Sequence, residues 1–150
     1  MALFEPAIQI TLINEGGLED DPSDPGGVTK YGISQRSYPS LDVRSLTVDQ
    51  AKAIYLQDFW LFGGIQDQSV ANKLFDMYVN MKHTAIRLAQ KVVAVPEDGL
   101  YGPKTEGAIN QKSAFLIGYK DVLITHYTDL VKARPELGKY LVGWLRRARQ

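Results

Sequence analysis

Apolar side chains recur along most of this 150-residue chain at the spacing of amphipathic α-helices. The first set predicts a helix over residues 4–15, with an apolar stripe made of Phe4, Ala7, Ile8 and Leu12. A second set starts at the capping-box pattern Thr47-x-x-Gln50 and predicts a helix to about Trp60, ended by Gly63-Gly64. Its inward positions are Ala51, Ile54, Tyr55 and Phe59.

The C-terminal half has the same helical character. Residues 69–95 form one long helical pattern, in which we expect a bend or break near His83-Thr84. The segment VPEDGLYGPKT is a turn, and its Pro103 suits the first position of the next helix. The longest apolar stripe stops at Pro135 and contains Leu116, Tyr119, Leu123, Tyr127 and Leu130. We expect a final helix over residues 138–149.

Residues 16–34 lack helical periodicity. Glycine, proline and aspartate are frequent there, which predicts a loop with at most a minor β-hairpin near residues 26–34, turned by Gly26-Gly27. No internal repeat, low-complexity tract or linker divides the chain. The sequence therefore predicts an all-α fold in a single compact domain, residues 1–150. A loop of this length in a compact domain is usually functional.

The composition is that of an ordinary globular protein, with 45% apolar and 23% charged residues. The 17 acidic and 17 basic residues balance, which argues against nucleic acid as a partner. The charge is unevenly placed, because the last acid, Glu136, is followed only by bases: Lys139, Arg146, Arg147 and Arg149. These bases either complement the dipole of the last helix or attract an anionic polymer weakly.

The sequence lacks cysteine and any pattern typical of a signal peptide or a membrane span. The chain has no cysteine, which excludes disulfides, thiol nucleophiles and Cys-based zinc sites. The opening MALFEPAIQI does not resemble a signal peptide, and no apolar run approaches the roughly 20 residues of a membrane span. We therefore expect synthesis in the cytoplasm, no integral membrane segment, and export by a route other than a signal peptide.

Glu15 occupies an unfavourable position for a carboxylate. It lies on the apolar stripe, three residues after Leu12, and in the last helical turn, where the helix dipole is negative. Burial, the dipole and nearby acids all favour the protonated carboxyl group that a general acid needs near neutral pH. The alternative is a solvated glutamate at a frayed helix end capped by Gly16-Gly17.

A second carboxylate, Asp24, follows Glu15 by nine residues across a proline-stiffened turn. Two carboxylates that face each other across a cleft can hydrolyse a glycosidic bond. One protonates the leaving oxygen, and the other supports a water nucleophile or the oxocarbenium-like charge. The hydroxyl of Thr29 could hold such a water. We interpret the remaining acids of the loop, Glu19, Asp20 and Asp21, as solvated charges.

Other interpretations fit the loop less well. An EF-hand that started at Asp20 would have Pro22 at position three and Tyr31 at position twelve, where oxygen ligands are required. The GK[ST] ending of a phosphate-binding loop is missing, and the acids would repel phosphate. His83 and His126 lack nearby partners of the kind that a zinc amidase needs. We therefore expect neither a metal nor another cofactor.

The run EGG…DPSDPGGVTKYGIS resembles the signature of the glycoside hydrolase family 108 muramidases, which are lysozyme-like enzymes of phages and bacteria. The similarity continues in DVRSLTVDQAKAIYLQDFW, in FDMYVN, and in VPEDGLYGPKT with the closing VGWLRRAR. The spacing of Glu15, Asp24 and Thr29 is also similar to the catalytic triad of phage-type lysozymes. The resemblance implies a lysozyme-like helical fold and hydrolysis of the β-1,4 bond between N-acetylmuramic acid and N-acetylglucosamine, with Glu15 as the acid.

The resemblance also implies how the chain is divided. It places catalysis in residues 4–90 and a peptidoglycan-binding helical part in residues 91–150, packed on the first. Contacts to the peptidoglycan glycan strand are expected from Gly27, Tyr31, Trp60, Asp76 and Asn80. Taken singly, the aromatic residues could equally be core, and Asp76 and Asn80 surface polar groups. A holin-like export partner and action in the periplasm or cell wall are further implications.

Two non-catalytic functions remain open from the sequence. The chain could be a peptidoglycan-binding module with a vestigial acid, or an accessory protein in secretion. The residues do not distinguish phage lysis, secretion and wall turnover.

Overall fold

The computed structural model describes residues 1–23 and 25–150, which form seven α-helices, two 3₁₀ helices and three very short strands. The predicted all-α fold with a minor β-hairpin is confirmed. The helices are α1 (Phe4–Glu15), α2 (Val48–Asp58), α3 (Gln68–Met81), α4 (His83–Val92), α5 (Pro103–Gln111), α6 (Phe115–Ala133) and α7 (Leu141–Arg149), with η1 (Val43–Ser45) and η2 (Pro135–Tyr140) as 3₁₀ turns.

The helices of the N-terminal half begin where their capping signals predict. Thr47 accepts a hydrogen bond from the Gln50 backbone N–H, and the Gln50 side chain accepts one from the Thr47 N–H, which completes the capping box of α2. The helix ends at Asp58, before the expected Gly63-Gly64. The reason is that the following aromatic segment leaves the helix to fill the core with Phe59 and Phe62.

The later helices differ from expectation only at their ends. The break predicted near His83 is found one residue earlier, at Lys82, which has a φ of 55° between α3 and α4. Helix α5 starts at Pro103 as predicted. The stripe of α6 buries Tyr119, Leu123 and Tyr127. Helix α7 starts at Leu141, three residues later than expected, because residues 135–140 wind as the 3₁₀ turn η2.

The small sheet contains one strand more than the hairpin that the sequence predicts. Its strands β1 (Leu18–Glu19), β2 (Thr29–Lys30) and β3 (Ile33–Ser34) are antiparallel in that order. The hairpin turn is Tyr31-Gly32 and not Gly26-Gly27, with φ values of 52° and 80°. Positive φ at both central positions is the geometry of tight hairpin turns that match strand twist. Strand β1 is exposed, so it shows no apolar alternation in the sequence.

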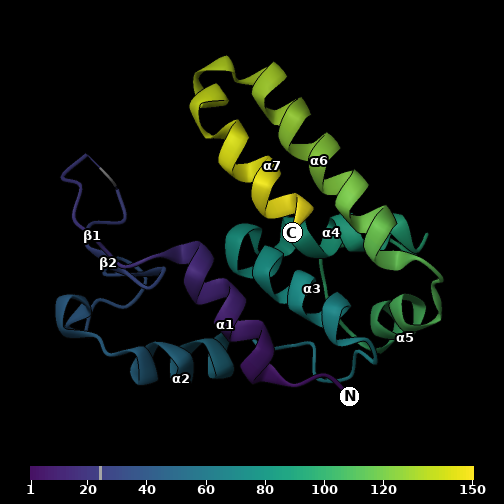
Figure 1. Ribbon diagram of the computed structural model, residues 1–150, viewed down its shortest axis with the longest axis horizontal. Helices are drawn as coiled ribbons and strands as arrows, with labels where there is room; N and C mark the ends of the chain where they lie inside the picture. The colour runs from purple at the N-terminus through teal and green to yellow at the C-terminus, as the bar shows by residue number, and fades with distance from the viewer. Residues whose placement is uncertain (24) are drawn as a thin grey trace.

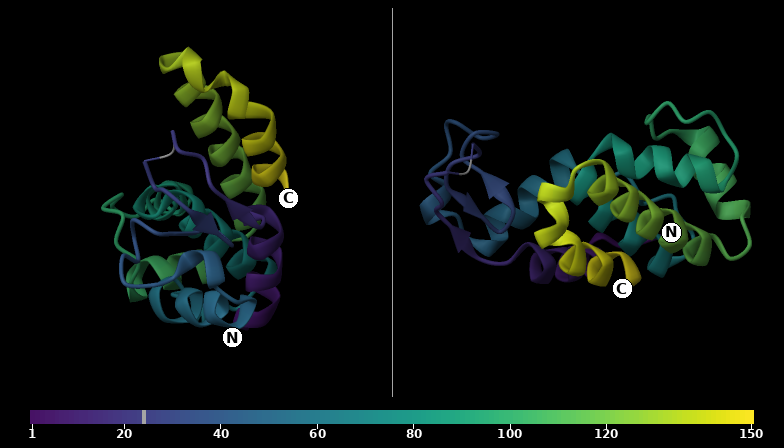
Figure 2. Two further views of the ribbon diagram at one scale, coloured as in Figure 1. Left: turned by 90° about the vertical axis from the view of Figure 1, so that its left-hand side faces the viewer. Right: turned by 90° about the horizontal axis from the view of Figure 1, so that it is seen from above.

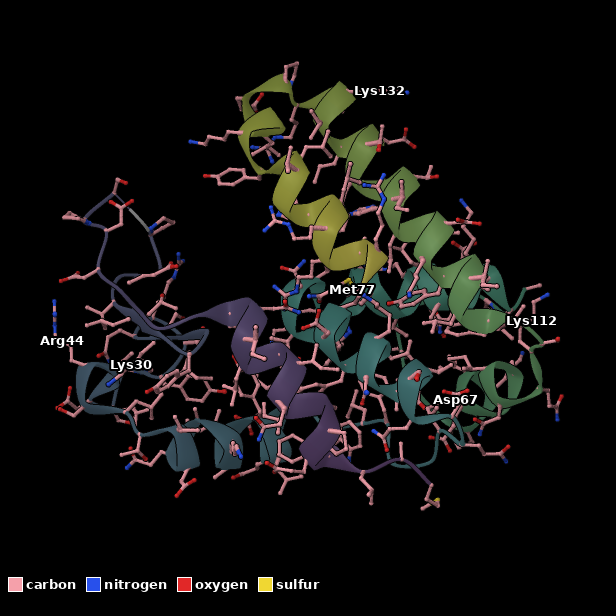
Figure 3. All side chains as sticks on the ribbon, in the orientation of Figure 1. Lys30, Arg44, Asp67, Met77, Lys112 and Lys132 are labelled. Carbon is pink, nitrogen blue, oxygen red and sulfur yellow. The ribbon has the colours of Figure 1, made fainter. Side chains whose placement is uncertain are left out.

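One continuous apolar core links the two halves of the chain. It runs from Ala2 beside α1, through α3, to Ala148 of α7. Helices α6 and α7 form an antiparallel hairpin that projects from the body, and α7 brings the C-terminus back beside α1 and α3 (Figures 1 and 2). Figure 3 shows Met77 of α3 beneath this end of α7.

None of the helices in the described part of the chain is long and apolar enough to cross a membrane.

Candidate active site

Glu15 is the last residue of α1 and lies at the point where the helix meets the β-lobe, which we define as residues 16–45. Gly16, with a φ of 74°, ends the helix and donates its N–H to the Leu12 carbonyl. The Glu15 side chain is 20% exposed, so it is neither in the core nor fully solvated. This partial burial agrees with its place at the edge of the apolar stripe of α1.

A cation from the far end of the sequence contacts Glu15. Arg147 of α7 donates from Nη2 to Glu15 Oε1 at 2.9 Å, and 132 residues separate the two in the chain. The Arg147 side chain is only 14% exposed. Oε1 is the only oxygen of the Glu15 carboxyl group that accepts a hydrogen bond from the described residues. The second oxygen, Oε2, accepts no hydrogen bond from them.

Asp76 of α3 holds Arg147 in place. Its carboxylate accepts from Arg147 Nε at 2.8 Å and from Nη2 at 2.9 Å, a two-pronged geometry that fixes the guanidinium plane. Thr11 and Asn14 of α1 donate to the same carboxylate at 2.9 and 3.1 Å. With its side chain 2% exposed, Asp76 is a buried charge fully supplied with donors. These contacts tie α1, α3 and α7 together beneath Glu15.

The β-hairpin closes on the other side of Glu15. A Cβ placed on Gly32 would lie 2.9 Å from Glu15 Cγ and would overlap the Tyr55 hydroxyl, so only glycine allows this approach. Tyr55 of α2 donates its hydroxyl to the Tyr31 carbonyl at 2.8 Å, which anchors the turn. Burial, and then the negative charge of Glu15, raises the pKa of Tyr55, so this hydroxyl stays protonated as a donor.

The other predicted catalytic residues are placed as follows. Thr29 lies half-buried on β2, paired with Glu19 and Ser34. Asp24 lies outside the described residues. Tyr31 sits in the hairpin turn, half-buried, with the Lys30 ammonium 5.5 Å from its ring centre.

The remaining predicted contacts to substrate are scattered. Trp60 packs edge-on against Phe4, Phe62 and Phe75, at the N-terminal end of α1 and therefore far from Glu15. Asn80 donates to the Tyr127 hydroxyl at 2.6 Å, and Asp76 is engaged by Arg147. Gly27 is exposed, with a φ of 70°. Asp76 shares Arg147 with Glu15, and Tyr31 precedes Gly32, which packs against the Glu15 side chain.

The other acids of the loop have local partners. Asp20 forms an ion pair with Arg44 of η1, and Asp21 accepts from the backbone and hydroxyl of Ser23. Glu19 is exposed on β1. Across the described residues, no three His, Cys, Asp or Glu side chains gather as they would around a metal ion.

Sequence reasoning missed Arg147 and Tyr55 as parts of the site. The signal for Arg147 was present in the run of bases that ends the chain, but the helix dipole explained that run equally well. No rule of spacing pairs residue 147 with residue 15, because the contact exists only once α7 packs back on α3. Tyr55 was predicted to be core, which it is, and its hydroxyl alone reaches the site.

Two of three comparisons with known proteins found matches. Residues 8–81 match the family model described as Glycosyl hydrolase 108. Residues 8–81 belong to the glycosyl hydrolase 108 family. Ten chains of known structure match this one, among them the "Structure of Brucella abortus SagA" at a TM-score of 0.80 and 26% sequence identity. That match covers 97% of this chain and 89% of the other. A comparison with curated proteins found no match.

At the level of the family, this match supports a glycoside hydrolase of the lysozyme-like, peptidoglycan-degrading kind. The matched segment includes Glu15, Gly32, Tyr55 and Asp76 but ends before α4. Arg147 therefore lies outside the family pattern, although the likeness to SagA extends over nearly the whole chain.

Proposed function

We propose that this protein is a muramidase that hydrolyses the β-1,4 bond between N-acetylmuramic acid and N-acetylglucosamine, with Glu15 as the general acid. The observation that supports this role is the asymmetry of the Glu15 carboxyl group. Arg147 engages Oε1, and Oε2 accepts no hydrogen bond from the described residues. A carboxyl group fixed at one oxygen can present the other, with its proton, to a glycosidic oxygen.

The reaction would follow the usual course of glycoside hydrolysis. Glu15 donates its proton to the leaving oxygen as the bond to the sugar C1 breaks, and C1 takes oxocarbenium-like charge. Water adds to C1, and its proton passes to a carboxylate. Asp24 is the proposed second carboxylate, and the Thr29 hydroxyl is the proposed holder of the water.

Arg147 and Asp76 would act as positioning residues. Asp76 holds the guanidinium with two hydrogen bonds, and the guanidinium holds Glu15 with a third. Small errors in the placement of a reacting group reduce rates strongly, so rigid support beneath Glu15 has a direct kinetic value. Gly32 and Tyr55 complete the support from the side of the β-lobe.

The test is Glu15→Gln, assayed by clearing of purified cell walls. The change preserves size and hydrogen bonding but removes the proton donor, so we expect clearing to fall at least about 100-fold. Glu19→Gln, an exposed acid four residues away, is the matched control and should clear as the parent does. Mass analysis should find new reducing ends on muramic acid.

Three outcomes would count against the proposal. Equal clearing by Glu15→Gln and the parent would exclude Glu15 as the acid. Reducing ends on glucosamine would mean that the other glycosidic bond is cut. A parent that binds walls and never clears them would favour the peptidoglycan-binding module.

A further inference from the structure

A pocket with a volume of about 340 Å³ adjoins the Glu15 site on the side of the β-hairpin. Gly32 and Tyr55, which touch the Glu15 side chain or lie beside it, also form one wall of this pocket. The opposite wall comes from the end of α2 and the junction of α3 and α4, and includes Asp58, Phe59 and Lys82. A ligand in the pocket would therefore contact residues that lie beside the proposed catalytic acid.

Lys82 provides the charge of this pocket. Its ammonium lies 3.5 Å from the centre of the Phe59 ring, which holds it by a cation–π contact. Among the residues that the structure describes, Lys82 forms no ion pair. The nearby Asp58 instead accepts a hydrogen bond from the Tyr38 hydroxyl at 2.7 Å. The Lys82 ammonium therefore packs on an aromatic ring and has no carboxylate partner among the described residues, so a ligand could supply one.

The backbone at Lys82 is strained, which suggests that the lysine side chain has a function at this position. Its φ of 55° and ψ of −128° belong to a region that glycine occupies easily and residues with a Cβ avoid. A helix break alone would be better served by glycine. Strain of this kind gathers at binding and catalytic sites. Partial burial also lowers the pKa of Lys82, against the influence of Asp58.

We infer that the Lys82 pocket binds a carboxylate that the substrate carries beside the scissile bond, on the lactyl arm of muramic acid or on its attached peptide. The inference rests on the proposed function for its substrate, because peptidoglycan carries such carboxylates and chitin-type glycans carry none. An ammonium seated on an aromatic ring is a donor suited to a carboxylate. The pocket would therefore select muramyl residues over plain N-acetylglucosamine chains.

Direct binding tests the inference without turnover. We expect N-acetylmuramyl dipeptide, titrated by NMR, to shift resonances around the pocket in the parent, and Lys82→Gln to weaken its binding about tenfold. Lys82→Arg should keep most of the affinity. Lys132→Gln, a matched loss of charge at the far end of α6, should change nothing (Figure 3). N-acetylmuramic acid as a second probe distinguishes the lactyl carboxylate from the peptide carboxylates.

Kinetics and stability complete the test. On intact walls, Lys82→Gln should lower kcat/KM about tenfold, and on chitin oligomers, which carry no carboxylate, it should not. Strands stripped of peptide expose the lactyl carboxylate, so a similar loss on them assigns the contact to that group, and no loss on them assigns it to the peptide. Lys82→Gly should keep the parent's midpoint of thermal unfolding, because it relieves the backbone strain while removing the ammonium.

Equal losses on cell walls and on chitin oligomers, unchanged binding of both muramyl probes, or a clearly lower unfolding midpoint in Lys82→Gly would overturn the inference. A parent that binds muramyl dipeptide through Lys82 but cuts no wall would refute the proposed function and leave the pocket intact.

Discussion

The two sides of Glu15 are built in different ways. On one side, the β-lobe and α2 bring Gly16, Gly32 and Tyr55 to the Glu15 side chain from within 40 residues of it. On the other side, α7 supplies Arg147 from 132 residues away. The first side lies inside the segment that matches the family, and Arg147 lies outside it.

This contrast shows that the family segment is not the whole site. The C-terminal hairpin was expected to be a peptidoglycan-binding part packed on a catalytic part. The structure shows that α7 also contacts the predicted acid and shares a buried ion pair with α3. Binding of peptidoglycan by residues 91–150 stays a prediction, and it is compatible with this second role.

The largest expected effect comes from breaking the buried pair on the α7 side. Asp76→Leu should lower the free energy of unfolding by about 3–5 kcal/mol, because it leaves Arg147 buried without its main partner. The double variant Asp76→Leu/Arg147→Met removes both charges and should recover much of that loss. Urea unfolding measures both variants, with the exposed Asp121→Leu on α6 as the control. A double variant no more stable than Asp76→Leu would mean that the ion pair does not link α3 to α7.

A smaller effect concerns the pH dependence of the same interface. Lys73 of α3 donates to the Arg147 carbonyl at 2.6 Å, and burial lowers its pKa to about 8. Above pH 8 the unfolded chain keeps a proton on Lys73 that the folded chain has released, so stability rises as pH increases. We expect a gain of about 2 kcal/mol between pH 8 and 10 from this residue.

Urea unfolding at a series of pH values measures this gain. Lys73→Met should remove the rise, and Lys132→Met should keep it. Burial raises the pKa of five tyrosines, so their ionisation in the unfolded chain lowers stability as pH approaches and passes 10: Tyr38, Tyr55, Tyr101, Tyr119 and Tyr127. The gain from Lys73 is therefore the difference between the parent and Lys73→Met at each pH. An unchanged slope in Lys73→Met would show that the ammonium is hydrated in the folded protein.

The smallest effect on stability lies on the β-lobe side. Gly32→Ala should cost about 1–2 kcal/mol through its positive φ, and it should reduce wall clearing because the new Cβ pushes on Glu15 and Tyr55. Gly27→Ala has a similar φ of 70° and open space around its Cβ, so it measures backbone strain alone. Equal losses of clearing in the two variants would mean that contact with Glu15 is unimportant.

Helical periodicity and capping signals predicted nearly all helices, because both are local properties of the chain. The break at Lys82 and the start of α5 at Pro103 are examples. The hairpin turn was assigned to Gly26-Gly27 in place of Tyr31-Gly32, since nothing local favours φ above zero at a tyrosine. Its conformation depends on the hydrogen bond from Tyr55, which arrives from α2.

For the candidate site, too, the predictions rested on local features of the sequence. Glu15 was predicted to be the acid from its helix position and from the EGG motif, both of which are local features of the sequence. Trp60, which was predicted to contact substrate, is partly buried against Phe4 and Phe75. A single tryptophan carries no sign in the sequence of which neighbours it will pack against. The sequence argument for Glu15 counted burial, the helix dipole and neighbouring acids. It did not count the Arg147 guanidinium, whose position depends on packing of the whole chain.

The most direct test of the account is the turnover number of the Asp76→Leu/Arg147→Met variant on purified cell walls. The double change removes both charges of the buried pair, so neither partner is left uncompensated. The folded variant can then be assayed without the contact between Arg147 and Glu15. We predict that kcat falls roughly 100-fold while KM changes little, and that the exposed Arg149→Met matches the parent. A folded double variant with kcat within about threefold of the parent would contradict the claim that the C-terminal helix forms part of the active site.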